Sequence, residues 1–440
     1  MKRRHTILAL AALLALGSAC TRTESMDAIG NRVFALALQQ FPLLDRQLEY
    51  GRMPRSLDAD GNLVTSDIGW WCSGFFPGSL WYVYEYTGFS SARSLAEKQT
   101  LRLEELPEAR TQHDIGFMVN NSYGNAYRLT GDMKYLDMIE FGARKLAGRY
   151  SPATGCTMSW EPQRGWGYPV IIDNMMNLEL LMNAYHMFGA DSLHTIAVTH
   201  ATTTMKNHFR EDASTWHLLD YSPEDGSVLQ RVTVQGYSDD SAWARGQAWG
   251  LYGYTMMSRE CAESEELCQK RQCVENDVTC TDCLEEEGHS AIFLAQAEKI
   301  ARMLLQRLPE DGIPYWDFDA PGVPGGLNAD ATDGNGRRIA PEDVLRDASA
   351  AAIMASAFIE LSTLTDDHAL ANACRSMAEK QIRTLASPDY LAAPGENGGF
   401  LLKHCVGHLP NNSEVDVPLT YADYYFLEAL VRLKKYKNIL

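Results

Sequence analysis

The sequence predicts an all-α fold, an (α/α)6 toroid in which six helical hairpins with long rim loops close into a ring. Three observations predict it. Apolar residues recur at i, i+3, i+4 and i+7 in twelve separate stretches of the 440-residue chain. Several stretches are joined by only a few residues, which makes antiparallel hairpins. No strands recur with the regularity that a parallel sheet needs.

The twelve predicted helices span, in chain order, residues 27–48, 76–86, 91–106, 114–130, 132–148, 171–188, 190–208, 241–258, 290–308, 344–363, 366–385 and 420–436. Breakers such as Thr87-Gly88 and Phe188-Gly189 separate them. Small residues after Asp347 suit a helix packed closely on both sides, as in an inner ring. We expect the long connections to gather at one rim around a cleft, in a single domain over residues 21–440.

The first 20 residues are typical of a bacterial signal peptide. A basic start at residues 2–4 precedes an apolar stretch, and small residues lead to Cys20 as in a lipobox, with the usual leucine displaced by one position to Leu16. We expect export, lipidation of Cys20, and a periplasmic or outer-membrane-attached location in a bacterium. Since no other stretch is apolar enough to span a bilayer, membrane contact is expected only through the lipid.

The charge excludes some partners. The formal net charge of -18 argues against nucleic acid and anionic membrane surfaces. An anionic substrate would therefore need a local basic island. The chain has no GxSxG, HExxH, P-loop or Rossmann glycine motif, so no cofactor and no metal is expected. Nothing in the sequence indicates the oligomeric state.

Five of the ten cysteines crowd into a polar insertion, residues 261–289. A disulfide-stapled surface loop is favoured over a zinc site, because the insertion holds a single C-x2-C pair, Cys280 and Cys283, with only His289 nearby. If Cys20 is lipidated, nine cysteines remain and at least one thiol stays unpaired.

The stretch SAWARGQAWGLYGY, residues 241–254, is the first candidate for a site. Ser241 is a suitable N-cap, and Arg245 and Trp249 follow it on the same helical face. Arginine and tryptophan together suit a ring that carries a carboxylate. A structural cation–π pair that closes a helix end explains the same residues, and the two interpretations stay open at this point.

Two aspartates are candidates for acid–base chemistry. Asp114 lies where a helix begins and is equally explained as an N-cap. Asp173 lies among Ile and Met residues with no Lys or Arg close by. It either caps its helix or has a raised pKa, which is what a general acid needs.

Loop residues offer further candidates. His217 and Gln235 precede the 241–254 stretch, and Trp70 and Trp71 lie in an aromatic, glycine-containing loop. A lone histidine is more often structural than catalytic. Rim loops are nevertheless where helical toroids usually supply binding groups.

Together the motifs WCSGFFPGSLW, HDIGF, IIDNMMN, STWHL, QGYSDDSAWARGQAW, PYWDFDAPG, RDASAAAI and ADYYFLEAL resemble the unsaturated glucuronyl hydrolases, glycoside hydrolase family 88. The resemblance extends from about residue 65 to the C-terminus and implies an (α/α)6 toroid. It implies that Asp173 is the general acid/base and Asp114 the second essential carboxylate, with His113 beside it. It also implies that the unsaturated sugar is bound by Trp71, His217, Gln235, Arg245 and Trp249, the tryptophans by stacking and Arg245 and His217 as polar or charged contacts.

The resemblance further implies the reaction. The family's substrates are lyase products whose terminal uronic acid has a C4=C5 double bond, an enol ether. An acid protonates C4, water adds at C5, and the hemiketal opens to release the saccharide. Two alternatives remain: an unsaturated rhamnogalacturonyl hydrolase acting on pectin fragments, and a catalytically inactive sugar-binding lipoprotein. A polysaccharide lyase would raise the absorbance of the double bond, whereas a hydrolase would remove it. The insertion at 261–289 departs from the family pattern.

Overall fold

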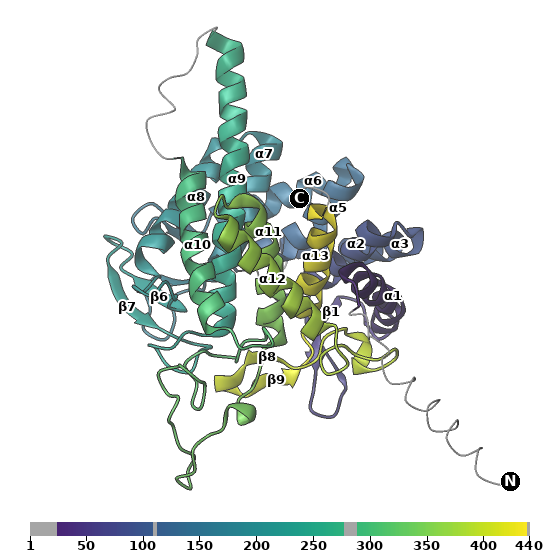
Figure 1. Cartoon of the computed structure of the whole chain (residues 1–440). Coiled ribbons are helices and arrows are strands. Elements are labelled where there is room, and N and C mark those ends of the chain that lie inside the picture. The colour runs from purple at the N-terminus through teal and green to yellow at the C-terminus, as the bar shows by residue number, and fades with distance from the viewer. Residues whose placement is uncertain (1–23, 109–111, 277–287, 438–440) are drawn as a thin grey trace, which may run out of the picture.

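The computed structural model of the chain describes residues 24–108, 112–276 and 288–437, and the side chains of residues 267–276 are not among its described parts. The predicted signal peptide and Cys20 lie outside the described residues. Within them, all twelve predicted helical stretches are present, arranged as the predicted toroid (Figure 1). No helix of the described part is long and apolar enough to cross a membrane.

Six helical segments form an inner ring. They are α2 (Phe75–Thr87), the segment formed by α4 (Ile115–Val119), the π-helical turn η2 (Asn120–Gly124) and α5 (Asn125–Thr130), then α7 (Asn174–Phe188), α9 (Ala244–Asn276), α11 (Ala348–Leu364) and α13 (Thr420–Tyr436). Each contacts the next, and α13 contacts α2, which closes the ring.

The outer ring consists of the helices that precede or follow these in the chain. They are α1 (Met26–Asp45), α3 (Ser90–Leu101), α6 (Leu136–Ala147), α8 (Asp191–Asn207), α10 (His289–Arg307) and α12 (His368–Leu385). Burial distinguishes the two rings. In α11 every residue from Ala348 to Ser362 is buried, as the small residues predicted, whereas α12 buries only one face, including Leu370, Cys374 and Ala378.

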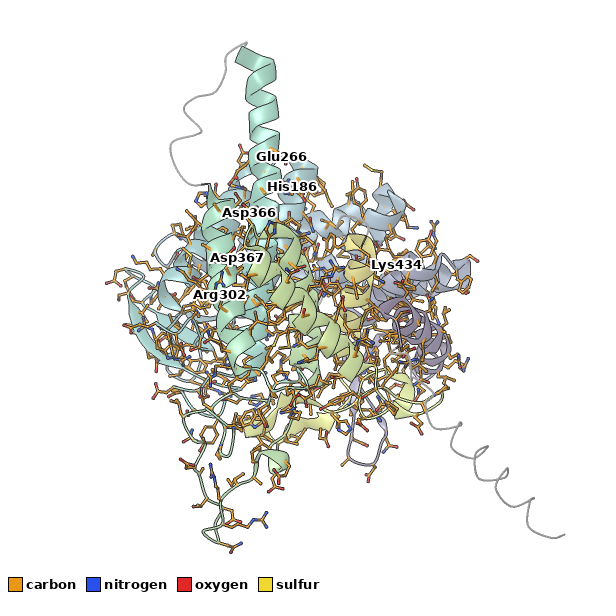
Figure 2. The ribbon with its side chains drawn as sticks, viewed as in Figure 1. His186, Glu266, Arg302, Asp366, Asp367 and Lys434 are labelled. Atoms are coloured by element: carbon orange, nitrogen blue, oxygen red, sulfur yellow. The ribbon has the colours of Figure 1, made fainter. Side chains whose placement is uncertain are left out.

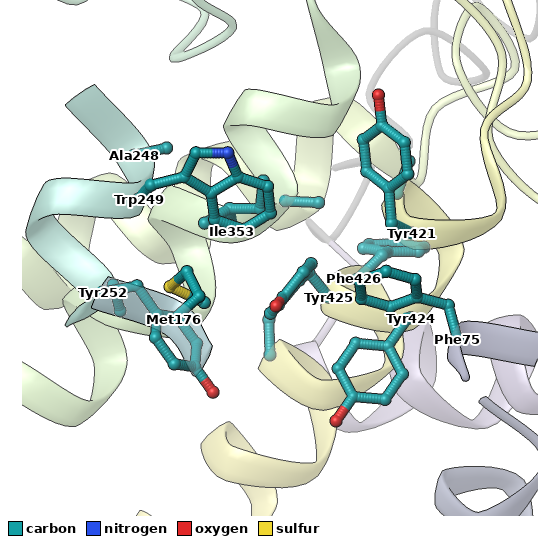
Figure 3. Close-up of a cluster of buried hydrophobic side chains, with 14 of the residues drawn as sticks. Phe75, Met176, Ala248, Trp249, Tyr252, Ile353, Tyr421, Tyr424, Tyr425 and Phe426 are labelled. Atoms are coloured by element: carbon teal, nitrogen blue, oxygen red, sulfur yellow. The ribbon is translucent and has the colours of Figure 1, made fainter. Parts of the chain in front are cut away.

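Aromatic and aliphatic side chains fill the middle of the ring. Phe75 of α2, Met176 of α7, Trp249 of α9 and Tyr425 of α13 are all buried and meet there (Figure 3). Many other charged groups lie on the outside. Arg302 of α10 and Asp367 before α12, for example, form an exposed ion pair of 2.6 Å between two outer helices (Figure 2). Such exposed pairs contribute little stability, so packing of the inner helices holds the ring together.

Four small antiparallel sheets lie in the long connections. In them β1 (Arg52–Leu57) pairs with β2 (Leu63–Asp67), β3 (Tyr150–Ser151) with β4 (Cys156–Thr157), β6 (Leu218–Tyr221) with both β5 (Pro169–Ile171) and β7 (Val228–Val232), and β8 (Cys405–His408) with β9 (Ser413–Val417). Short 3₁₀ turns are η1 (Leu106–Glu108), η3 (Met133–Tyr135), η4 (Pro341–Asp343), η5 (Asn397–Gly399) and η6 (Leu409–Asn411). The strands were not predicted because runs this short show no clear alternation.

Two predictions about α9 are wrong. Ser241 is not its N-cap: the helix begins at Ala244, and the Ser241 hydroxyl instead donates a hydrogen bond of 2.7 Å to Asp317. The start of the polar insertion is not a loop, since α9 continues to Asn276 and extends beyond its neighbours at the top of Figure 1. Cys261 is buried in this helix as a free thiol, so it does not staple a loop. Cys280 and Cys283 lie outside the described residues.

Gly116 allows α4 to approach α7 closely. A methyl group at this position would lie 2.5 Å from the Asn177 side-chain oxygen and 2.7 Å from the Asn177 Cα. With no side chain there, the Asn177 oxygen accepts a hydrogen bond of 2.9 Å from the Phe117 amide. The first turns of two neighbouring inner helices are thereby held together.

We expect Gly116→Ala to lower the free energy of unfolding by about 1–3 kcal/mol, because the added methyl overpacks this contact. The midpoint of urea denaturation measures the change. Gly334→Ala is the matched control, since nothing lies within 4 Å of that position. Equal midpoints for the two variants would contradict the tight α4–α7 contact.

Candidate active site

A pocket of about 360 Å³ lies at the rim where the inner helices begin. Trp71 precedes α2, Asp114 and Asp173 immediately precede α4 and α7, and Arg245 and Tyr421 are the second residues of α9 and α13. All five line the pocket. Because helix N-termini carry partial positive charge, their convergence favours an anionic ligand.

Asp173 occupies the N-cap position of α7 but does not cap it, because its side chain makes no capping hydrogen bond. Its Oδ2 atom is buried without a hydrogen-bond partner among the described residues. Burial, followed by the nearby Asp114 carboxylate, raises the pKa of Asp173 from 3.8 to about 7, while Arg245 and the Trp249 indole act in the opposite direction. This carboxyl group can therefore hold a proton at neutral pH.

Asp114 shares two features with Asp173, an uncapped helix start and a raised pKa. It precedes α4 without a capping hydrogen bond, and burial raises its pKa to about 7 against the opposing effect of Asn177. Asn177 lies one turn after Asp173 on α7, and its amide group also contacts the Asp173 carbonyl at 3.5 Å. The same asparagine accepts a hydrogen bond from the Phe117 amide, so it joins the two helix starts that carry the aspartates.

The hydrogen bonds of His217 determine its tautomer. Its Nδ1 accepts hydrogen bonds from the amides of Val234, at 3.0 Å, and Gln235, at 3.3 Å. Burial lowers the pKa of His217 to about 3, so the ring is neutral and its hydrogen is on Nε2. The Nε2 atom lies 4.0 Å from the Asp173 Oδ2. His217 is therefore a neutral donor beside Asp173, which favours the polar over the charged form of the predicted contact.

His113 has the opposite tautomer. Its Nδ1 donates to the Ser159 carbonyl at 2.7 Å, and burial lowers its pKa to about 3. Its Nε2 therefore presents a lone pair, 3.2 Å from the Asp114 Oδ1. A lone pair so close to a carboxyl oxygen favours the protonated form of Asp114.

The chain is similar to proteins of a known enzyme family. No family model matches the chain, but an unsaturated glucuronyl hydrolase from Formosa agariphila is 38% identical over 366 residues, which cover 82% of this chain and 79% of that one. The chain belongs to the unsaturated glucuronyl hydrolases. It is therefore a glycoside hydrolase, as the motifs suggested.

The chain is also similar to other members of this family. A crystal structure of an unsaturated glucuronyl hydrolase specific for heparin is 40% identical, with a TM-score of 0.80 and coverage of 94% of this chain and 98% of that one. An unsaturated chondroitin disaccharide hydrolase from Streptococcus pneumoniae is 30% identical over 407 residues, 90% of each chain. These similarities confirm the (α/α)6 toroid of family 88.

In this hydrolase Arg245 is held by the protein itself. Its guanidinium lies 3.3 Å from Asp347, the N-cap of α11, and donates to the carbonyls of Val406 and Gly407. It also lies over the ring of Trp243, 4.5 Å from the centroid. A cation–π pair of Arg245 with Trp249 was one of the two interpretations that the sequence left open. The ring under the guanidinium is Trp243 and not Trp249, and the acidic partner, Asp347, comes from another helix.

The two predicted stacking tryptophans differ. Trp71 lines the pocket and packs against Phe117 and Tyr421. Trp249 is only 1% exposed and its ring packs between Phe117 and Tyr425, which leaves no face for a sugar. Its indole nitrogen is buried near Asp173 without a partner among the described residues. The expected stacking role of Trp249 is therefore wrong, and its contribution is to the environment of Asp173.

Several pocket residues were missed by the sequence analysis. Tyr421 lines the pocket and Asn177 lies beside Asp114, but neither residue was singled out within its predicted helix. Trp160 lines the pocket from the 149–170 connection, where an aromatic residue on a long rim loop was a usable signal. Gln235 was predicted and does line the pocket, with its amide donating to the Gly407 carbonyl at 3.2 Å.

One cluster could in principle hold a metal ion. His186, Glu260 and Glu263 have ligand atoms within 4.8 Å of one another. The cluster lies at the other end of α7, about 20 Å along the helix from Asp173. Glu260 is already paired with His186 at 3.1 Å and with Arg259 at 3.0 Å. The cluster is therefore explained as an ion-pair network away from the pocket.

The raised pKa of Asp173 has a consequence for stability. Between about pH 4 and pH 7 the folded protein binds more protons here than the unfolded chain, so stability falls as the pH rises through this window. We expect Asp173→Asn, which has no proton to lose, to raise the free energy of unfolding by about 2–4 kcal/mol at pH 8 and far less at pH 4. Urea denaturation at both pH values measures this, with the exposed Asp60→Asn as control. An equal change at both pH values would contradict the raised pKa.

Proposed function

We propose that this hydrolase removes the 4,5-unsaturated glucuronyl residue from the non-reducing end of lyase-generated glycosaminoglycan oligosaccharides. The observation that carries the proposal is the pair of buried, uncapped carboxyl groups, Asp114 and Asp173, each with a pKa raised to about 7. Relatives named for chondroitin disaccharides and for heparin support the glycosaminoglycan class.

Asp173 is the proton donor in this proposal. Its proton goes to C4 of the enol ether, and the positive charge that develops is shared between C5 and the ring oxygen. Water adds at C5 and gives up a proton to the Asp173 carboxylate, which restores the acid. The resulting hemiketal opens by breaking the C5–O5 bond, and the hemiacetal left at C1 then releases the saccharide. No bond to the enzyme forms, which distinguishes this reaction from ordinary glycoside hydrolysis.

The other groups position or stabilise. The Nε2–H of His217, 4.0 Å from the Asp173 Oδ2, and the Trp249 indole lie near Asp173 and stabilise its carboxylate once the proton has left. Asp114, when ionised, stabilises the developing positive charge. Trp71 offers a ring face to the sugar, and the converging helix N-termini favour the substrate carboxylate. Arg245 hydrogen-bonds mainly to protein groups. In this proposal it holds the β8 backbone at Gly407 in place and also faces the substrate.

Two alternatives to this activity lead to different observations. A rhamnogalacturonyl hydrolase would act on a pectin-derived unsaturated disaccharide instead of a chondroitin or heparin one. A sugar-binding lipoprotein would bind without consuming the double bond. Retention of two raised-pKa carboxyl groups supports catalysis over binding alone, because burying them costs stability.

The decisive variant is Asp173→Asn. We expect the wild-type enzyme to remove the ultraviolet absorbance of the conjugated double bond from unsaturated chondroitin or heparin disaccharides, and the variant to be slower by about 10²–10⁴-fold. Because the acid must be protonated, wild-type kcat/KM should fall about tenfold per pH unit above pH 7. A variant with wild-type rate would remove Asp173 from the mechanism, and a rise in absorbance would identify a lyase.

We also propose that the enzyme is exported and anchored by a lipid on Cys20, which the basic, apolar and small-residue segments of residues 1–20 support. Cys20→Ser should move the protein from the membrane fraction to the soluble fraction of the producing bacterium. Thr23→Ala, a few residues further along, should leave the fractionation unchanged. Membrane association of the Cys20→Ser variant would contradict the anchor.

A further inference from the structure

The pocket carries an ion pair that the proposed reaction does not use. Arg55 of β1 and Glu414 of β9 both line the pocket, and the Arg55 Nε lies 2.6 Å from the Glu414 Oε1. Their side chains are 25% and 13% exposed, so the pair is largely shielded from water. The Arg55 guanidinium also lies over the Trp70 ring, 4.9 Å from its centroid.

The backbone is adapted to hold Glu414 in this place. Glu414 has a φ of +57°, a left-handed conformation that is unfavourable for a residue other than glycine. Its side chain lies directly over Gly407, where a methyl group would come within 2.5 Å of the Glu414 Cβ and 2.6 Å of its Oε2. A carboxylate needed only for solubility would require neither feature. The close approach to Gly407, which also lines the pocket, holds the Glu414 side chain at the pocket wall.

The pair lies where the second sugar of a substrate would pass. Asp114 and Asp173 are mostly buried, whereas Trp70 beneath Arg55 is 39% exposed. An enzyme that acts on the terminal ring holds that ring next to its catalytic carboxyl groups. The following sugar therefore lies toward the exposed end of the pocket, beside Arg55 and Glu414.

We propose that Glu414 determines specificity against an anionic substituent, such as sulfate, on the sugar that follows the unsaturated ring. The inference rests on the proposed function and deepens it. The Arg55 guanidinium is already paired with Glu414. A sulfate on the second sugar therefore meets a carboxylate instead of a free cation. Like charges in a partly shielded site repel, whereas a neutral hydroxyl meets a neutralised pair.

The test compares kcat/KM on two unsaturated disaccharides that differ by one sulfate on the second sugar. In Glu414→Gln we expect the ratio of sulfated to unsulfated kcat/KM to rise at least about tenfold over wild type, because Arg55 becomes free to bind the sulfate. Arg55→Met should lower the same ratio below wild type, because the Glu414 carboxylate then has no counter-charge in the pocket.

Asp416→Asn is the matched control. Asp416 lies in the same strand, has a φ of +56°, and pairs with His404 at 2.6 Å, but its half-exposed side chain does not line this pocket. In Asp416→Asn the ratio of sulfated to unsulfated kcat/KM should equal that of the wild type. If Glu414→Gln does not fold, Glu414→Asn is used, since asparagine is also uncharged and tolerates a left-handed backbone.

The outcomes separate the two proposals. An unchanged ratio in the neutral Glu414 variant, with activity retained on the unsulfated disaccharide, overturns the role of Glu414 and leaves the hydrolase function standing. If the wild-type enzyme removes the double-bond absorbance of neither disaccharide, both the hydrolase function and the role of Glu414 are overturned. A ratio that rises equally in Asp416→Asn also overturns the role of Glu414, since the effect would then be one of overall charge.

Discussion

The direction of the inner helices is the constraint on which the rest of the structure depends. Each inner helix is followed or preceded by an outer helix that returns the chain, so all inner helices run the same way. The contact of α13 with α2 closes the ring and brings the first turns of these helices to one rim. Asp114, Asp173, Arg245 and Asp347 all lie at or next to such a first turn. The pocket is therefore a direct product of ring closure.

Several unsatisfied polar groups meet around Asp173. Asp173 and His217 each present a buried atom without a hydrogen-bond partner in the described residues, and so does the indole of Trp249. At the other end of the ring, by contrast, buried Glu428 accepts hydrogen bonds from Tyr82, Tyr252 and Ser356. Polar groups left unpaired in a folded protein cost free energy unless a ligand completes them. Their grouping around one carboxyl group is what favours chemistry there over a purely structural role.

Catalysis and selectivity are assigned to different parts of the chain. The carboxyl groups belong to rigid helix starts, which Asn177 holds together. The exposed end of the pocket is formed by two hairpins, β1–β2 and β8–β9, whose residues Arg55 and Glu414 are 359 positions apart. Hairpins tolerate substitution better than inner helices do. Substrate preference can thus change without disturbing the proton donor.

Sequence periodicity alone determined the twelve helices and their closure into a ring, because an amphipathic or fully apolar repeat has few ways to bury itself. The surroundings of Asp173 also identified it, since a carboxylate among Ile and Met residues has few explanations. The partners of Arg245 and Trp249 were decided only by tertiary structure. Asp347 and the 406–407 carbonyls reach Arg245 from more than 100 residues away, and Trp249 is enclosed by Phe117 and Tyr425. Helical spacing shows which residues share a face, but what that face meets depends on the closed ring.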